Sequence, residues 1–176
     1  MAGTHGLPSG TLPDTGLILR HYDDPDRRAL AAAFGQACRA RGIVFLVAGD
    51  WRLALACGAD GLHLPSYLVA RRAAWKTARS DWIVTAAVHT MGDAMRAWRS
   101  GVDGVLVSPV FPTRSHPGAP ALGPLAAARL AAAFPGPVFA LGGMDEGRWR
   151  RLAPLGFAGW AGIGAWTPAS PAGDAE

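Results

Sequence analysis

The feature that most constrains the fold is an alternation of short apolar runs with helix-like segments, repeated roughly every twenty to thirty residues along the chain. The apolar runs lack the polar alternation of a sheet with one face in water, so they predict strands buried on both faces. Such strands belong to a parallel sheet covered by helices, which indicates the α/β class. The predicted strands are Leu17–Arg20, Ile43–Ala48, Asp60–Leu64, Trp82–Val88, the apolar run that begins at Asp103, Pro137–Leu141 and Ala158–Ile163.

Helices are expected between these strands. They run from the turn at Asp23–Pro25 to about Arg41, around Trp51–Cys57, from Ser66 to about Ala78, from about Met91 to Ser100, over Pro124–Phe134 and over Asp145–Leu155. Their order fits either a doubly wound sheet or a (β/α) barrel.

The residues at the strand ends favour the barrel. A doubly wound sheet usually carries a Gly-rich phosphate fingerprint after its first strand, and residues 20–23 (RHYD) are of a different kind. Polar residues and glycines recur instead where strands end: Arg20, Asp50, His63, His89, Thr113, Gly142, Gly143 and Gly164. A closed barrel needs eight strands and the sequence provides about seven. We therefore predict a (β/α)8 TIM-barrel type that lacks the first β-strand and helix.

One domain is expected over residues 17–166 of the 176. Residues 1–16 are rich in Gly, Pro and Thr and are predicted to be a disordered tail or the remnant of the first βα unit; residues 167–176 are predicted to be a disordered tail. Two explanations of the missing unit stay open. Either the coding sequence begins upstream, which we favour as a hypothesis, or the barrel works open or completed by a partner.

Composition excludes several classes of function. The net charge is +4, but the arginines are scattered over several helices without a recognised motif, so nucleic-acid binding is not expected. Lys76 is the one lysine and lies in a helix-like segment, which argues against a Schiff-base aldolase. Cys38 and Cys57 lack metal-ligand spacing and read as small buried apolar residues of a reducing compartment. No apolar run is long enough to span a membrane, so a cytoplasmic location is predicted, and the oligomeric state, including a homo-oligomer, stays open.

The loop that follows the fifth predicted strand is the first site candidate. It contains Thr113, Ser115 and His116, and in a barrel ligands bind at loops that leave the C-terminal ends of strands. His116 is the best candidate for acid–base chemistry or phosphate contact. The alternative is an ordinary turn.

The exits of the last two strands are the second candidate. Gly142 and Gly143 follow one strand, and Ile163 and Gly164 follow the other. Barrels commonly bind phosphate there through backbone N–H groups, although the same glycines could serve only a turn or close packing.

Asp50 and the histidines allow two interpretations each. Asp50 follows a strand and could bind a cation or cap the next helix. His63 lies inside a strand, so it reads as a hydrogen-bonded packing residue or a ligand contact rather than a free base. His21, His63, His89 and His116 come from separate βα units without paired spacing, so a transition-metal site is not expected.

In order and spacing, the motifs of this chain resemble the thiamine phosphate synthase and TenI-like family of (β/α)8 barrels. The resemblance runs from about Leu17 to Trp166, and its most specific pieces are ADGLHL at 59–64 and SPVFPT at 108–113. Further pieces are LR at 19–20, GD at 49–50, VHT at 88–90, ALGGM at 140–144 and the segment 159–165.

The resemblance implies an activity and a set of roles. In the synthase an aminopyrimidine diphosphate ionises, and the nitrogen of a thiazole phosphate captures the cation with loss of pyrophosphate, a reaction that uses Mg²⁺. Carried over by position, Arg20 would contact the diphosphate and Asp50 would bind Mg²⁺. The thiazole phosphate would be held by Thr113, Ser115, Gly142, Gly143, Ile163 and Gly164.

This chain departs from the family pattern mainly around the diphosphate. Residues that the family pattern would have as Gln, Lys, Asn, a second magnesium carboxylate, Ser and Lys are here Ile18, Tyr22, Gly49, Leu68, Ala87 and His116. Each lost charge-assisted contact is worth roughly 1.5–3 kcal/mol. Synthase chemistry is the favoured hypothesis. The alternatives are a TenI-like thiazole phosphate isomerase, in which His116 would replace a histidine found where this chain has Pro109, and a phosphate-ligand binding protein without catalysis.

Overall fold

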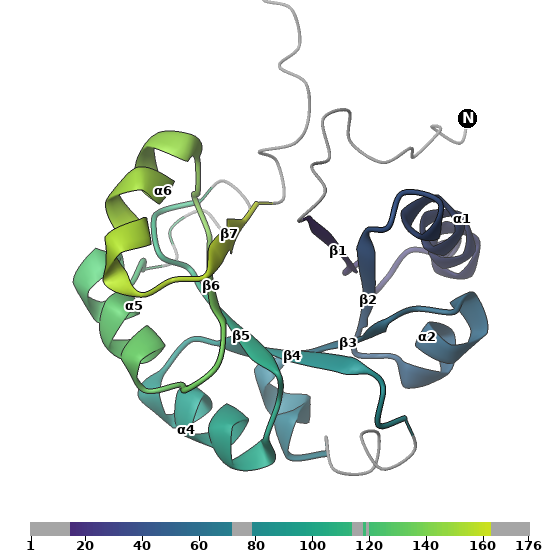
Figure 1. Cartoon of the computed structure of the whole chain (residues 1–176), viewed down its shortest axis with the longest axis horizontal. Helices are drawn as coiled ribbons and strands as arrows, with labels where there is room; N and C mark the ends of the chain where they lie inside the picture. The colour runs from purple at the N-terminus through teal and green to yellow at the C-terminus, as the bar shows by residue number, and fades with distance from the viewer. Residues whose placement is uncertain (1–14, 72–78, 114–117, 119, 163–176) are drawn as a thin grey trace, which may run out of the picture.

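The structure is a computed structural model that describes residues 15–71, 79–113, 118 and 120–162. A parallel sheet of seven strands, in the order β1 to β7, curls into an arc with helices on its outer, convex side (Figure 1). The strands are β1 Gly16–Leu19, β2 Val44–Ala48, β3 Gly61–Leu64, β4 Ile83–Val88, β5 Gly104–Val107, β6 Val138–Leu141 and β7 Gly159–Ala161. The helices are α1 Arg27–Arg39, α2 Trp51–Cys57, α4 Met91–Ser100, α5 Gly123–Ala132 and α6 Glu146–Leu152, with 3-10 turns η1 Ser66–Arg71 and η2 Ala153–Leu155.

The predicted barrel type with a missing unit is confirmed. Each strand pairs in parallel with its neighbour in sequence, from Leu17 beside Phe45 in β1–β2 to Ala140 beside Trp160 in β6–β7. Within the described ranges, β1 pairs only with β2 and β7 only with β6, so the sheet stays open between its two ends. All seven strands fall where the apolar runs predict them.

Two helix predictions need correction. The segment after Ser66 was expected to be an α-helix to about Ala78, but its described part is the 3-10 turn η1. The helix expected over Asp145–Leu155 ends at Leu152 and continues as η2, whose Pro154 lacks the N–H that an α-helix would use. The other helices agree to within a few residues, which is the usual scatter of helix ends.

The core lies between the sheet and the helices. Strand residues that alternate along the chain, such as Leu62 and Leu64, are fully buried in it together with the small residues Ala31 and Ala97 of the helices. Small residues allow a helix to pack close to the sheet. Cys38 is buried there as predicted and Cys57 is partly buried; burial raises the pKa of both thiols. None of the helices in the described ranges has both the length and the apolar character needed to cross a bilayer.

Asp-Gly pairs organise the starts of β3 and β5. The Asp60 carboxylate accepts the backbone N–H of Phe45 in β2 at 2.8 Å, and the Asp103 carboxylate accepts the N–H of Val84 in β4 at 2.7 Å. Each carboxylate thus accepts a backbone N–H group of the preceding strand that has no carbonyl partner in the next strand of the sheet. The following Gly61 is required by space, because a Cβ there would collide with the backbone of Ile83.

Candidate active site

The C-terminal ends of the parallel strands place the predicted site residues at one edge of the curled sheet. Arg20 follows β1, Asp50 follows β2, His63 lies in β3, His89 follows β4 and the Gly142–Gly143 pair follows β6. In barrel folds this edge carries the active site. Thr113, which follows β5, is partly buried. Ser115, His116, Ile163 and Gly164 lie outside the described residues, so their predicted roles remain predictions.

His63 is a buried polar group of the sheet's inner face. Because Leu62 and Leu64 face the helices, the alternation of the strand points His63 toward the concave side. Its Nδ1 lies 3.0 Å from the Thr85 hydroxyl in β4. Burial, helped by the positive charge of Arg20 and the nearby His89, lowers the pKa of His63 to about 4. The imidazole is therefore neutral at pH 7, which fits the expectation of a hydrogen-bonded residue rather than a free base.

His89, which follows β4, is hydrogen-bonded to the backbone of Ser108 at the end of β5. Its Nδ1 lies 2.7 Å from the carbonyl oxygen of Ser108, and a carbonyl can only accept, so Nδ1 carries the proton. The Ser108 hydroxyl lies 3.4 Å from the same nitrogen, and the residue is exposed. Arg20, His63 and His89 come from separate βα units and lie at or next to the C-terminal ends of β1, β3 and β4, at the same edge of the sheet.

Asp50 takes the capping role that the sequence left open. Its Oδ1 accepts the backbone N–H of Leu53 at 3.0 Å and so caps α2. Its Oδ2 lies 3.9 Å from Nη1 of Arg27, the first residue of α1. Capping alone does not exclude a metal, because one carboxylate can do both.

The surroundings of Asp50 do not fit a protein-built magnesium site. The backbone of Gly49 lies against Tyr22, Leu68 and Pro65, since a Cβ there would be 3.4–3.9 Å from all of them. Mg²⁺ takes six oxygen ligands in octahedral geometry, usually one or two carboxylates together with waters and substrate phosphates. This corner instead offers one carboxylate, an arginine and an apolar wall. Within the described ranges no group of three or more His, Cys, Asp and Glu side chains could hold a metal ion.

The glycine loop after β6 packs tightly on the loop after β5. The N–H groups of Val110 and Phe111 donate to the carbonyls of Leu141 and Gly142, at 2.9 and 3.1 Å. Gly142 has φ +96°, and a Cβ on it would lie 2.8 Å from the Cα of Pro109. Gly143 has φ +61°, and its Cβ would collide with the carbonyl of Pro112. Glycine is thus required at both positions.

Two arginines at this edge were not predicted as site residues. Arg27 reaches Asp50, and Arg148 of α6 donates a hydrogen bond to the carbonyl of Gly143 while its guanidinium carbon lies 5.0 Å from the centre of the Phe111 ring. Both occur in the first turn of a helix that follows a strand exit. That position was the available signal, but one sequence does not tell which way a long side chain turns.

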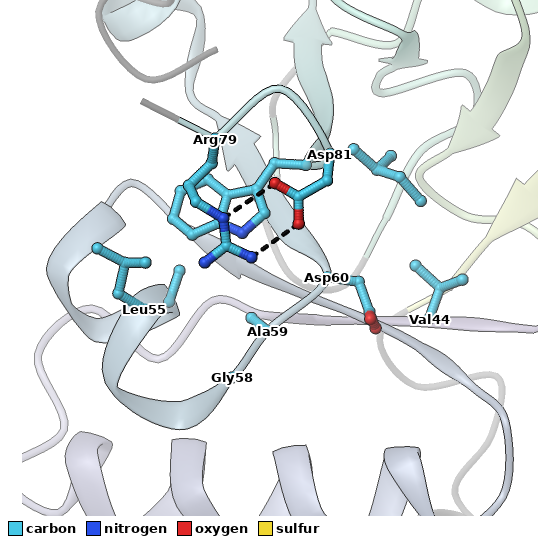
Figure 2. A pocket seen from close by; sticks show the side chains of 10 residues that line it. Val44, Leu55, Gly58, Ala59, Asp60, Arg79 and Asp81 are labelled. Carbon is cyan, nitrogen blue, oxygen red and sulfur yellow. Dashed lines mark hydrogen bonds and ion pairs between the residues drawn. The ribbon is translucent and has the colours of Figure 1, made fainter. Parts of the chain in front are cut away.

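A hollow of about 340 Å³ lies at the opposite edge of the sheet (Figure 2). It is lined by the starts of β2 and β4, Val44 and Ile83, and by the Asp60 turn. Arg79 and Asp81 form a bidentate pair at 2.7 and 2.9 Å beside it. Since barrel active sites lie at the C-terminal ends of strands, this hollow is not the candidate site.

Comparison with known proteins identifies the family. The model of the family described as "Thiamine monophosphate synthase" matches residues 15–166, most of the chain. The chain belongs to the thiamine monophosphate synthase family.

Members of the thiamine monophosphate synthase family with curated names extend this finding. The chain is 36% identical over 143 residues to "Thiamine-phosphate synthase" of Geobacillus kaustophilus, covering 80% of this chain and 64% of that protein. It is 35% identical over 141 residues to "Thiamine-phosphate synthase" of Chlorobium luteolum, covering 80% of this chain and 66% of that protein. This family member thus spans about two thirds of the length of both. Its fold also matches the solved "Thiamine phosphate pyrophosphorylase from Pyrococcus furiosus" with a TM-score of 0.70 at 23% identity, over 85% of this chain and 72% of that one.

Proposed function

We propose that this chain is a transferase of thiamine biosynthesis that joins hydroxymethylpyrimidine diphosphate to thiazole phosphate and releases pyrophosphate. Support comes from membership of the family and from relatives at 35–36% identity whose names state that activity. The proposed partners are these two small phosphorylated molecules and not nucleic acid, and the proposed location is the cytoplasm.

The observation that carries the proposal is the placement of Arg20, His63 and His89 at the ends of β1, β3 and β4, on the edge of the sheet where barrels bind their substrates. In the proposed reaction the bond between the pyrimidine methylene carbon and the diphosphate oxygen breaks, and its electron pair leaves with the diphosphate. Arg20 supplies a permanent positive charge where that negative charge develops. The thiazole nitrogen then forms a bond to the methylene carbon. His63 is neutral, so its ring can donate or accept a hydrogen bond without attracting the negatively charged diphosphate away from Arg20.

The thiazole phosphate is assigned to the glycine-rich exits. Barrels commonly bind phosphate through backbone N–H groups at this edge, and Gly142 and Gly143 follow β6 there, packed against Pro109 and Pro112 of the loop after β5. Thr113 borders the same pair of loops in sequence, and Ser115, Ile163 and Gly164 are proposed to complete the set on the basis of the family pattern alone. No step is assigned to Mg²⁺, because the residues around Asp50 do not fit it.

A second candidate function rests on the corner around Gly49. Tyr22, Leu68 and Pro65 make that corner apolar, whereas Gly142 and Gly143, which the resemblance assigns to the thiazole phosphate, are present and follow β6. This contrast favours a protein that binds thiazole phosphate without joining it to the pyrimidine, either as a non-catalytic binder or as an isomerase using His116.

The deciding experiment is thiamine phosphate formation by the purified 176-residue chain given both substrates, with calorimetric titration of thiazole phosphate in parallel. Product formation supports the transferase. Binding of thiazole phosphate without product supports the second candidate.

The variant Arg20→Ala separates the two candidates further. We expect it to lower product formation about a hundredfold or more, as removal of a charge-stabilising donor does, while thiazole phosphate binding stays unchanged. Arg28→Ala, an exposed arginine of α1, is the matched control and should retain activity.

A further inference from the structure

Arg27 is a fixed cation at the exit of β2. Its side chain is only 15% exposed, and its Nη2 donates to the carbonyl of Ala48, the last residue of β2, at 2.6 Å. The guanidinium carbon lies 5.3 Å from the centre of the Tyr22 ring, within the range of a cation–π contact. Strand and ring together hold the guanidinium in one place.

That place is next to the Asp50 carboxylate. Nη1 of Arg27 lies 3.9 Å from Oδ2 of Asp50, the oxygen that does not cap α2. Asp50 itself is half exposed, with 43% of its side-chain surface accessible. Its free oxygen therefore already faces a positive charge, and an arginine in a protein keeps that charge at any ordinary pH.

A divalent ion at the same oxygen would be repelled by the guanidinium. It would also find Leu68 and Tyr22 beside Gly49, which offer no carboxylate. Mg²⁺ is usually held by one or two carboxylates with waters and substrate phosphates, and here the one carboxylate oxygen that does not cap α2 lies 3.9 Å from a guanidinium nitrogen.

We propose that Arg27 takes the place of a divalent cation beside Asp50, so that Asp50 binds no metal and the positive charge of this corner is built into the chain. The inference rests on the proposed function in one respect, which is that the corner around Asp50 belongs to the active site. It predicts that Tyr22, at a position where the family pattern has a lysine, anchors a cation supplied by Arg27 instead.

The test uses Mn²⁺ without substrate, so its outcome is independent of any catalytic activity. Carboxylate sites for Mg²⁺ also take Mn²⁺, whose binding is followed by the electron paramagnetic resonance of the free ion. The proteins are the unchanged chain, Asp50→Asn, Arg27→Gln, the double variant and Arg28→Gln. Arg28→Gln removes the same charge from the exposed neighbouring position and is the matched control.

We expect Asp50→Asn to leave Mn²⁺ affinity unchanged, whereas Arg27→Gln raises it about tenfold over Arg28→Gln and the double variant loses the gain. The proposal is overturned if Asp50→Asn weakens Mn²⁺ binding of the unchanged chain about tenfold, or if folded Arg27→Gln binds no more tightly than Arg28→Gln. Asparagine still caps a helix, so the Asp50→Asn comparison decides the matter even if Arg27→Gln does not fold.

Discussion

The Nδ1 atom of His63 and the hydroxyl of Thr85 lie 3.0 Å apart, and this contact joins β3 to β4 on the inner face of the sheet. Both side chains are buried, with 5% and 7% of their surface exposed. Because the ring is buried near Arg20 and His89, the protein strongly prefers its neutral form. Stability and electrostatics of the candidate site therefore depend on the same residue.

The first prediction concerns acid stability. The pKa of His63 is lowered to about 4 in the folded protein, against about 6.5 in the unfolded chain. The stabilising contribution is therefore fully present above pH 6.5 and is lost as the pH falls toward 4, by up to about 3 kcal/mol. Urea unfolding at a series of pH values from about 7.5 down to about 4 measures this loss in the free energy of unfolding.

The variant His63→Gln provides the comparison for that titration. It should lose stability less steeply over the same pH interval, because it lacks the group that titrates. Parallel pH profiles for the two proteins would contradict the assignment.

Thr85→Val tests the partner of His63. The variant keeps the shape of the side chain but leaves a buried imidazole nitrogen without its hydroxyl, so we expect the free energy of unfolding to fall by about 1–3 kcal/mol. Thr85→Ser retains the hydroxyl and should recover a good part of the loss. Equal stabilities of the Val and Ser variants would mean that this hydrogen bond contributes little.

Asp60→Ala tests the hydrogen bond between the Asp60 carboxylate and the backbone of β2 at the start of β3. Without the carboxylate, the N–H of Phe45 loses its 2.8 Å acceptor, and we expect a loss of about 1–3 kcal/mol in thermal or denaturant unfolding. Asp81→Ala is the control, because Asp81 is exposed and pairs with the exposed Arg79, so its loss should change stability little. A similar effect of both variants would argue against a special role of Asp60.

Gly143→Ala tests the glycine loop. Its φ of +61° and the close carbonyl of Pro112 leave no room for a methyl group, so the loop must shift. Calorimetry should show at least about tenfold weaker binding of thiazole phosphate. Gly147→Ala, in α6, is the control that should leave affinity unchanged, because the added Cβ would lie at an ordinary contact distance of 3.4 Å from Oδ1 of Asp145. Unchanged affinity in folded Gly143→Ala would remove this loop from the proposed site.

Local sequence signals were sufficient for the architecture. The apolar runs predicted seven strands in the right places because a strand buried on both faces is apolar at most of its positions. Asp50 follows a strand and does cap the next helix, which is one of the two roles that its position allowed, since a cap depends only on neighbours in the chain. The segment after Ser66 was predicted less well, because nothing local distinguishes a 3-10 turn from the start of an α-helix.

The candidate site was predictable only in part. Strand order alone brings Arg20, Asp50, His63, His89 and the glycine loop to one edge, because parallel strands all end on the same side. The roles assigned to Ser115, His116, Ile163 and Gly164 stay predictions.

The sequence by itself determined which residues stand at the strand exits, because periodicity and capping are properties of neighbouring residues. Only the tertiary structure decided their state. Burial among strands made His63 neutral, and the Arg27 side chain extends from α1 to lie beside Asp50, where the family resemblance implied Mg²⁺ and the sequence also allowed a helix cap. Desolvation and charge pairing depend on groups far apart in the chain, and no pattern of neighbours contains that information.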